Sequence, residues 1–217
     1  MTFIETTLQH LFQKQIPVIR ASSLSDALWT AEQLLQAHFT CVEFTFTTPQ
    51  ISAFFNAPRP HWIPPHALIG LGTLTTPLQV ETVLEMPFPP DFVASPGLLE
   101  EAPLKQAIKG FKERDILYMA GVATPSELMH ALALGVEAVK WFPAEPLGGS
   151  STLKTMKAPF PEAKLMPFGG VHPSQVNGYL EAGAWAVGMG TCLMPRPDQL
   201  KARDSSGFQR DLKAFLA

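Results

Sequence analysis

Short apolar runs alternate with longer amphipathic segments along almost the whole chain of 217 residues. Apolar runs of four to six residues, many of them rich in β-branched side chains, are typical of buried strands. They predict strands at 16–21, 41–46, 68–72, 92–96, 116–121, 138–143, 164–169 and 186–190. Between them, apolar positions that recur with the helical period predict helices, for example at 23–38, 124–135 and 172–183.

The ends of the predicted helices carry matching signals. Thr124, Pro125 and Glu127 supply an N-cap, a proline for the first helical position and an early acid. Gly135 and Gly183 follow helical segments where a C-cap favours a positive φ. These signals support the helix boundaries that the apolar pattern predicts.

Eight β/α repeats in about 200 residues predict an α/β protein with a (β/α)8 barrel, the TIM-barrel fold. We expect a single domain over residues 1–217, opening with a short helix at about 2–14. A doubly wound sheet of eight strands is the competing architecture. The even repeats, and the lack of a glycine-rich dinucleotide loop after the first strand, favour the barrel. The proline-rich stretches 56–66 and 85–92 are expected to be rigid surface connections within this domain.

Charged residues lie on the faces that should point into the barrel. Lys140 alternates with Val139 and Trp141, and the large apolar residues should pack on the helices. Glu43 and Arg20 occupy equivalent alternating positions in two other predicted strands. We therefore expect Arg20, Glu43 and Lys140 to converge inside the barrel, toward the C-terminal strand ends where barrel active sites lie. A buried ion-pair network without catalytic function is the alternative.

This set of residues favours carbonyl chemistry. An ordinary lysine is protonated at neutral pH, but burial and a nearby cation disfavour the ammonium and free the amine to attack a ketone. A carboxylate within reach would transfer the protons. The six histidines are scattered without the spacing of metal ligands, so neither a metal nor a cofactor is expected.

The charge and composition of the chain limit the classes of partner and the location that we expect. The net charge is −3 and no basic cluster stands out, which argues against nucleic-acid binding. No stretch approaches 18 apolar residues, so no membrane span is expected. The N-terminal segment does not resemble a signal peptide, and Cys41 and Cys192 form no framework pattern. We expect a reduced, cytoplasmic protein that acts on a small molecule.

Two glycine-containing loops indicate a phosphate site. Residues 168–174 follow the seventh predicted strand, and residues 188–191 end the eighth. Backbone N–H groups in these two adjacent loops form the recurrent phosphate site of the barrel fold. Each glycine pair alone is weak evidence, since glycine at a strand-to-helix turn often serves only steric needs.

Six segments in order resemble the 2-keto-3-deoxy-6-phosphogluconate (KDPG) and 4-hydroxy-2-oxoglutarate (KHG) aldolase family. The likeness runs from about residue 14 to 195, and is carried by "EFTFTTP", "GLGT", "ASPG", "AGVATPSEL", "KWFPAE" and "PFGGVHPS". The resemblance implies a class I aldolase and a homotrimer of barrels. The implied reaction cleaves KDPG to pyruvate and glyceraldehyde 3-phosphate, with KHG as a second substrate.

The resemblance also implies roles for single residues. Lys140 would form the Schiff base and Glu43 would be the general acid and base. Thr73 would hold the pyruvyl carboxylate. The pocket would be lined by Pro96, Phe142 and Phe168, and the phosphate would be held by Gly169, Gly170, Gly190 and Thr191.

The chain departs from the family pattern at two positions. Thr47 stands where some members carry an arginine, and we assign the carboxylate-binding cation to Arg20 instead. Phe168 stands where threonine is usual, which removes a hydroxyl and adds bulk. The open alternatives are an aldolase for 2-keto-3-deoxy-6-phosphogalactonate or another 2-oxo acid, a thiamine-phosphate-synthase-like transferase, and a non-catalytic barrel that binds a phosphorylated metabolite.

Overall fold

The computed structural model describes residues 2–12 and 14–216. Within these residues, eight parallel strands are hydrogen-bonded in the order β7-β6-β5-β4-β3-β2-β1-β8. They are β1 (Gln15–Ile19), β2 (Cys41–Thr45), β3 (Leu68–Gly72), β4 (Phe92–Ala94), β5 (Leu117–Val122), β6 (Ala138–Trp141), β7 (Leu165–Pro167) and β8 (Val187–Met189). The two strands at the ends of this order, β7 and β8, are bridged by the Trp185 N–H, which donates to the Leu165 carbonyl at 2.8 Å. The sheet is thus a nearly closed barrel, as the repeats predict.

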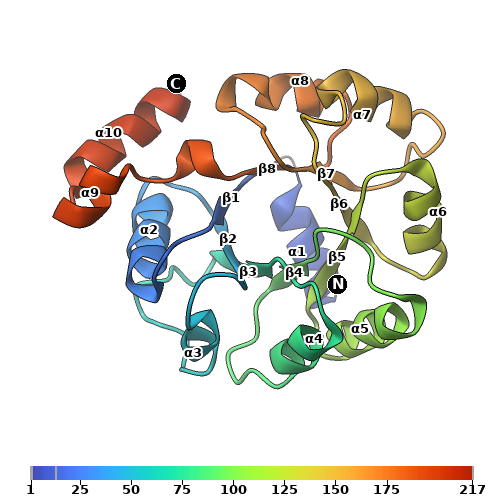
Figure 1. Ribbon diagram of the computed structural model, residues 1–217, viewed down its shortest axis with the longest axis horizontal. Helices are drawn as coiled ribbons and strands as arrows, with labels where there is room; N and C mark the ends of the chain where they lie inside the picture. The colour runs from blue at the N-terminus through green and yellow to red at the C-terminus, as the bar shows by residue number, and fades with distance from the viewer. Residues whose placement is uncertain (1, 13, 217) are drawn as a thin grey trace.

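The helices that follow β1 surround the barrel (Figure 1). The helices of the described residues are α1 (Phe3–Leu11), α2 (Leu24–Gln36), α3 (Ile51–Phe55), α4 (Pro77–Leu84), α5 (Glu101–Glu113), α6 (Pro125–Ala133), α7 (Gly149–Lys157), α8 (Val176–Glu181), α9 (Pro197–Ala202) and α10 (Ser205–Leu216), with 3-10 turns η1 (Pro173–Gln175) and η2 (Thr191–Leu193). The sequence did not predict α9 and α10, which follow β8. Among the described residues, no helix has the length and apolarity needed to cross a bilayer.

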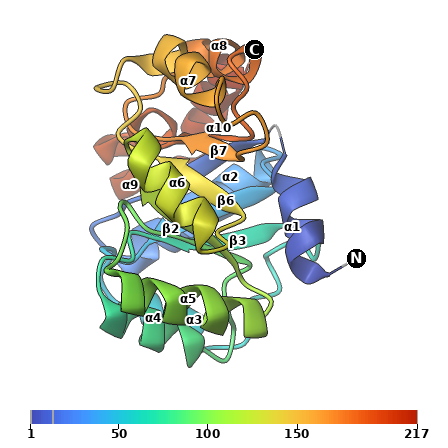
Figure 2. The ribbon, with the colours of Figure 1, turned by 90° about the vertical axis from the view of Figure 1, so that its right-hand side faces the viewer.

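The N-terminal helix α1 closes one end of the barrel. Its buried side chains Ile4, Leu8 and Leu11 join the inner cluster, which includes Cys41 at the start of β2 and Ala138 at the start of β6. Burying each such side chain is worth about 1.5–3 kcal/mol. Figure 1 shows α1 through the centre of the ring, and Figure 2 shows it at one end of the molecule. Because α1 covers the N-terminal strand ends, the opposite end remains for a substrate.

The helix ends follow the predicted chemistry. Thr124 caps α6 by accepting from the Glu127 N–H, and the Glu127 carboxylate accepts from the Thr124 N–H in return. Gly135 and Gly183 have φ values of 88° and 94°. The predicted boundaries of the long helices are therefore confirmed to within a few residues.

The outer face of the sheet carries apolar side chains that pack against the helices. Val42, Phe44, Val139 and Trp141 belong to the outer cluster that packs on the helices. Phe44 contacts the Phe54 ring of α3 with centroids 5.2 Å apart. The predicted division of strand faces is confirmed for β2 and β6.

The proline-rich segment 56–66 connects α3 and β3 without a helix or strand, as predicted. The Arg59 guanidinium ties it together by donating to the carbonyls of Pro64 at 3.2 Å and Ala67 at 2.6 Å. The second segment, 85–92, crosses from α4 to the first residue of β4. Both are connections within the barrel.

Candidate active site

Lys140 and Glu43 meet inside the barrel. Lys140 lies on β6, Glu43 lies in the middle of β2, and Lys140 Nζ donates to Glu43 Oε1 at 2.8 Å. The side chains are only 4% and 0% exposed. A hydrogen bond between a buried amine and a buried carboxylate is a direct path for a proton.

The second carboxylate oxygen of Glu43 is buried and has no hydrogen-bond partner among the described residues. Leaving a buried polar atom unsatisfied costs about 1–3 kcal/mol, and such atoms are a reason to look for function. Gly72 permits this placement, because a side chain there would collide with Oε1. Oε2 is therefore available to a hydroxyl of a bound substrate.

One aromatic ring covers the amine, and a second ring stacks on the first. Lys140 Nζ lies 4.1 Å from the centroid of the Phe168 ring. Phe168 in turn stacks on Phe142, with centroids 5.9 Å apart and an interplanar angle of 25°. A cation over an aromatic face is favoured by about 0.5–2 kcal/mol, so this wall suits a positive charge at Nζ, whether ammonium or iminium.

Arg20 lies at the rim rather than inside the barrel, which corrects the expectation from strand alternation. Strand β1 ends at Ile19, and Arg20 is exposed. Its Nη1 donates to Thr47 Oγ1 at 3.1 Å, and Thr47 Oγ1 donates to Thr45 Oγ1 at 3.1 Å. In the part of the chain that the structure describes, Arg20 pairs with neither Glu43 nor Lys140. The guanidinium of Arg20 is thus held at the mouth of the barrel, where it can meet an anion.

Hydroxyl groups at the end of β2 position Arg20. Besides accepting from Thr47, Thr45 Oγ1 donates to the carbonyl of Ile19 at 3.2 Å. The Ala21 N–H donates to Thr48 Oγ1 at 3.4 Å. The sequence reading treated Thr47 only as a missing arginine; the threonines that follow Glu43 in "EFTFTT" were the available signal for this support.

Thr73 and Pro96 lie at the same end of the barrel. Thr73 directly follows β3, and Pro96 lies two residues after β4. Thr73 is half-buried and has a φ of 66°. A β-branched residue in this left-handed region costs about 1–3 kcal/mol and is typical of functional positions. Pro96 is half-buried, and its backbone lies against Gly121, the register partner of Lys140. Both residues thus lie at the C-terminal end of the barrel, and their roles in binding stay predictions.

The two glycine loops lie at the ends of β7 and β8. Gly169 and Gly170 have φ values of 103° and 82°. Among the hydrogen bonds of the described residues, neither of their N–H groups is used as a donor. Gly190 is half-buried, and the exposed Thr191 begins η2. The loops therefore present backbone donors at the same end of the barrel as Lys140.

Glu145 supports the first of these loops, and the sequence reading missed it. Its N–H donates to the Gly169 carbonyl at 3.0 Å. Its carboxylate accepts from Gln175 Nε2 at 2.9 Å and from the Tyr179 hydroxyl. Burial, and then the Glu145 carboxylate, raise the pKa of Tyr179 above its ordinary value, so the phenol remains a donor. Glu145 ends the "KWFPAE" segment that carries Lys140, which was the available signal.

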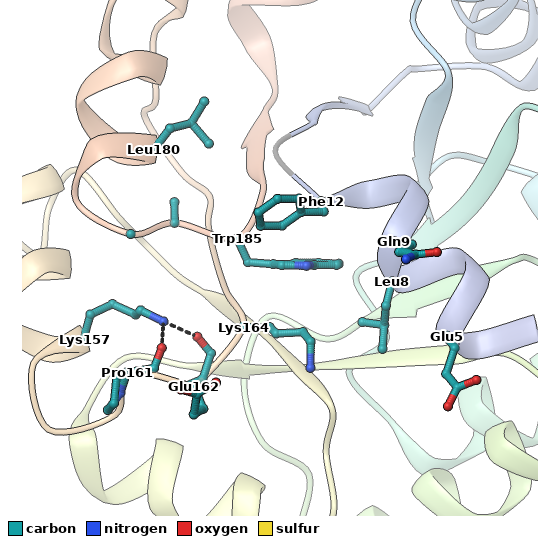
Figure 3. A pocket seen from close by; sticks show the side chains of 13 residues that line it. Glu5, Leu8, Gln9, Phe12, Lys157, Pro161, Glu162, Lys164, Leu180 and Trp185 are labelled. Carbon is teal, nitrogen blue, oxygen red and sulfur yellow. Dashed lines mark hydrogen bonds between the residues drawn. The ribbon is translucent and has the colours of Figure 1, made fainter. Parts of the chain in front are cut away.

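A separate hollow of about 930 Å³ opens at the other end of the barrel (Figure 3). Its lining includes Leu8 of α1 and the following Phe12. It also includes Lys164, which directly precedes β7, and Trp185, which lies two residues before β8. Lys157 closes one side by donating to the carbonyls of Pro161 and Ala163. Neither Lys140 nor Glu43 reaches this hollow, so it is distinct from the candidate active site.

Other reactive groups do not compete with Lys140. Burial raises the pKa of the Cys41 thiol to about 12, so it is not a thiolate at neutral pH. Within residues 2–12 and 14–216, no group of three or more His, Cys, Asp or Glu side chains is arranged to hold a metal ion.

Comparison with known proteins finds relatives that cover most of the chain. A sequence model of the KDPG and KHG aldolase family matches residues 4–209. The KHG/KDPG aldolase of Escherichia coli K12 is 32% identical over 189 residues, which cover 87% of this chain and 84% of that protein. The 2-dehydro-3-deoxy-phosphogluconate aldolase of Zymomonas mobilis is 30% identical over 206 residues, covering 90% of this chain and 92% of that protein.

A crystal structure of KDPG aldolase from Legionella pneumophila superposes with a TM-score of 0.80 at 31% identity and covers 96% of each chain. In that structure pyruvate was captured as a covalent carbinolamine intermediate. The family match decides against the transferase alternative, since it covers nearly the whole barrel. This chain belongs to the KDPG and KHG aldolase family.

Proposed function

We propose that the protein is a class I aldolase that cleaves a 4-hydroxy-2-oxo acid to pyruvate and an aldehyde through a Schiff base on Lys140. The observation that carries this proposal is the buried hydrogen bond between Lys140 Nζ and Glu43 Oε1. Two substrates fit the reaction. KDPG would give pyruvate and glyceraldehyde 3-phosphate, and KHG would give pyruvate and glyoxylate.

The first stage forms the Schiff base. Glu43 accepts a proton from the Lys140 ammonium, and the free amine adds to the C2 ketone to give a carbinolamine. Glu43 then returns the proton to the departing hydroxyl. Of the three ammonium protons, two leave with the ketone oxygen as water and one stays on the iminium nitrogen.

The second stage breaks the carbon–carbon bond. Glu43 accepts the proton of the C4 hydroxyl, the C3–C4 bond breaks, and the aldehyde departs. The electron pair passes through C3 and C2 to the iminium nitrogen and leaves an enamine. Glu43 then protonates C3, and water adds to the resulting iminium to release pyruvate and restore the Lys140 ammonium. The unpartnered Oε2 of Glu43 supports this role, because it is free to accept the C4 hydroxyl.

The remaining residues bind the substrate. Arg20 and Thr73 would hold the carboxylate of the pyruvyl half, and Pro96 and Phe142 would line its pocket. A phosphate at the far end of a long substrate would accept from the backbone of Gly169, Gly170, Gly190 and Thr191. This part of the proposal is supported by the shared end of the barrel and by the unused N–H groups of Gly169 and Gly170.

We also propose that the protein acts in the cytoplasm as a homotrimer. With KDPG as the substrate, the reaction would belong to sugar-acid breakdown of the Entner–Doudoroff type. The family resemblance and the two unpaired cysteines support these points. Gel filtration with light scattering would test the trimer.

Borohydride trapping tests the catalytic role directly. The purified protein is reduced with borohydride in the presence of pyruvate, and intact-mass and peptide mass spectrometry locate the adduct. We expect one pyruvate-derived adduct on Lys140, none in K140M, and an unchanged adduct in the matched control K164M, whose lysine lies in the hollow at the other end. A folded protein without an adduct, or an adduct on another lysine, would contradict the proposal.

A further inference from the structure

The position of the Phe168 ring bears on which substrate the site takes. The backbone at this residue is fixed on both sides: its N–H donates to the Trp141 carbonyl at 3.0 Å, and its carbonyl accepts from the Ala144 N–H at 2.8 Å. The side chain follows Met166, an inner-cluster residue of β7, by two positions and so points into the mouth. The ring therefore cannot leave the mouth without a change of rotamer.

The ring spans the space between the amine and the loop after β8. Its centroid lies 4.1 Å from Lys140 Nζ. At the other side, a Cβ placed on Gly190 would lie 3.6 Å from the ring carbons Cε2 and Cζ. The Phe168 ring thus lies between the atom that would bond to C2 of the substrate and the loop assigned to the phosphate.

The wall of β8 is shaped to admit the ring. A Cβ on Gly188 would lie 2.9 Å from Phe168 Cδ2, closer than real Cβ contacts, so a side chain at position 188 would displace the phenyl group. The ring also stacks on Phe142. The ring is packed on three sides, which makes it a fixed part of the pocket wall rather than a side chain extending into solvent.

This placement has two consequences for a bound substrate. With its phosphate at the glycine loops, as proposed above, a phosphorylated sugar acid would run its carbons 4 to 6 from Nζ past the Phe168 ring. The two phenyl groups also offer no hydrogen bond to hydroxyl groups on that tail, and leaving those hydroxyls unpaired lowers affinity. A short tail without charge meets neither difficulty.

We propose that Phe168, together with Phe142, makes this aldolase select 4-hydroxy-2-oxo acids with a short, uncharged tail over phosphorylated six-carbon substrates. The inference rests on the proposed Schiff-base function and names its substrate class. The probe of this class is 4-hydroxy-2-oxopentanoate, which has a methyl group beyond C4 and gives pyruvate and acetaldehyde.

The test compares kcat/KM for 4-hydroxy-2-oxopentanoate, KHG and KDPG in the wild type, F168T and F168V. In the wild type we expect the order 4-hydroxy-2-oxopentanoate, then KHG, then KDPG. In F168T and F168V the ratio should move toward KDPG by at least about tenfold, the lower range for a pocket change of this size. F168V separates bulk from the threonine hydroxyl, and it keeps the test decisive should F168T fail to fold.

Phe160→Thr is the matched control. Phe160 is also partly buried, but it lies between α7 and β7 and packs on the outer cluster away from Lys140. F160T should leave the substrate ratio unchanged. The proposal is overturned if the wild type prefers KDPG or KHG, or if removing the ring leaves the ratio unchanged within about threefold. Borohydride trapping with pyruvate, which has no tail, separates this outcome from a failure of the Schiff-base mechanism.

Discussion

Replacing Glu43 by methionine removes one half of the buried ion pair and leaves Lys140 without a counter-charge. Both side chains are almost fully buried, at 4% and 0% exposure, so water cannot replace the lost partner. Methionine has a similar length and no polar atom that matches the carboxylate. The variant therefore isolates the electrostatic contribution of Glu43 to the folded state.

The structure sets the size of the effect. Two unit charges 2.8 Å apart attract by about 6 kcal/mol at an effective dielectric constant of about 20. Removing one partner of a buried pair costs about 3–5 kcal/mol, because the remaining charge is buried alone. We expect E43M to lose about 3–5 kcal/mol in the free energy of unfolding, a fall in Tm of about 6–20 °C for a chain of this size.

Urea titrations followed by circular dichroism measure this loss, at one protomer concentration for all variants because assembly would contribute to the apparent stability. The double variant K140M/E43M replaces both charges by apolar groups, and it should recover most of the loss. E101M is the matched control. Glu101 forms an ion pair of 2.6 Å with Lys105, but the side chains are 59% and 57% exposed, so its removal should leave the midpoint unchanged.

Two results would refute this reasoning. If E43M were as stable as the wild type, the pair would contribute nothing to folding. If K140M/E43M were as unstable as E43M, the loss would come from packing around position 43 rather than from the unpaired ammonium.

Three further changes test other parts of the site. Arg20→Gln removes the cation at the rim and should raise KM for the 2-oxo acid by about tenfold to a hundredfold with a smaller effect on kcat, as steady-state kinetics would show; an unchanged KM would remove Arg20 from the carboxylate site. Gly72→Ala places a methyl group against the carboxylate of Glu43 and should lower kcat at least about tenfold, whereas Gly97→Ala, which enters open space, should leave kcat unchanged. The pKa of Cys41 is raised to about 12 in the folded protein, so the unfolded thiol ionises first as pH rises and stability should fall by about 1.4 kcal/mol per pH unit above about pH 9. Urea midpoints between pH 8 and 11 for the wild type and C41A would show this slope in the wild type alone, and equal slopes would contradict the assignment.

The pattern of the chain already determined the architecture. Buried strands need continuous apolar runs and surface helices need an apolar stripe, so the β/α alternation and the predicted caps indicate the barrel without knowledge of long-range contacts. Strand alternation also placed Glu43 and Lys140 on the inward face. That inference is local, since it needs only the period of two along each strand.

Only the tertiary structure decided how the site is built. Glu43 and Lys140 are 97 positions apart, and their 2.8 Å contact depends on the register of every strand between β2 and β6. Alternation placed Arg20 inside the barrel, but β1 ends one residue earlier, and the side chain turns to Thr47 at the rim. Sequence likewise showed that Phe168 replaces a threonine, yet the stacking of its ring over Nζ depends on the packing between β6, β7 and β8. A period of two fixes the face on which a side chain lies, whereas its depth along the barrel and its rotamer are set by neighbours from distant parts of the chain.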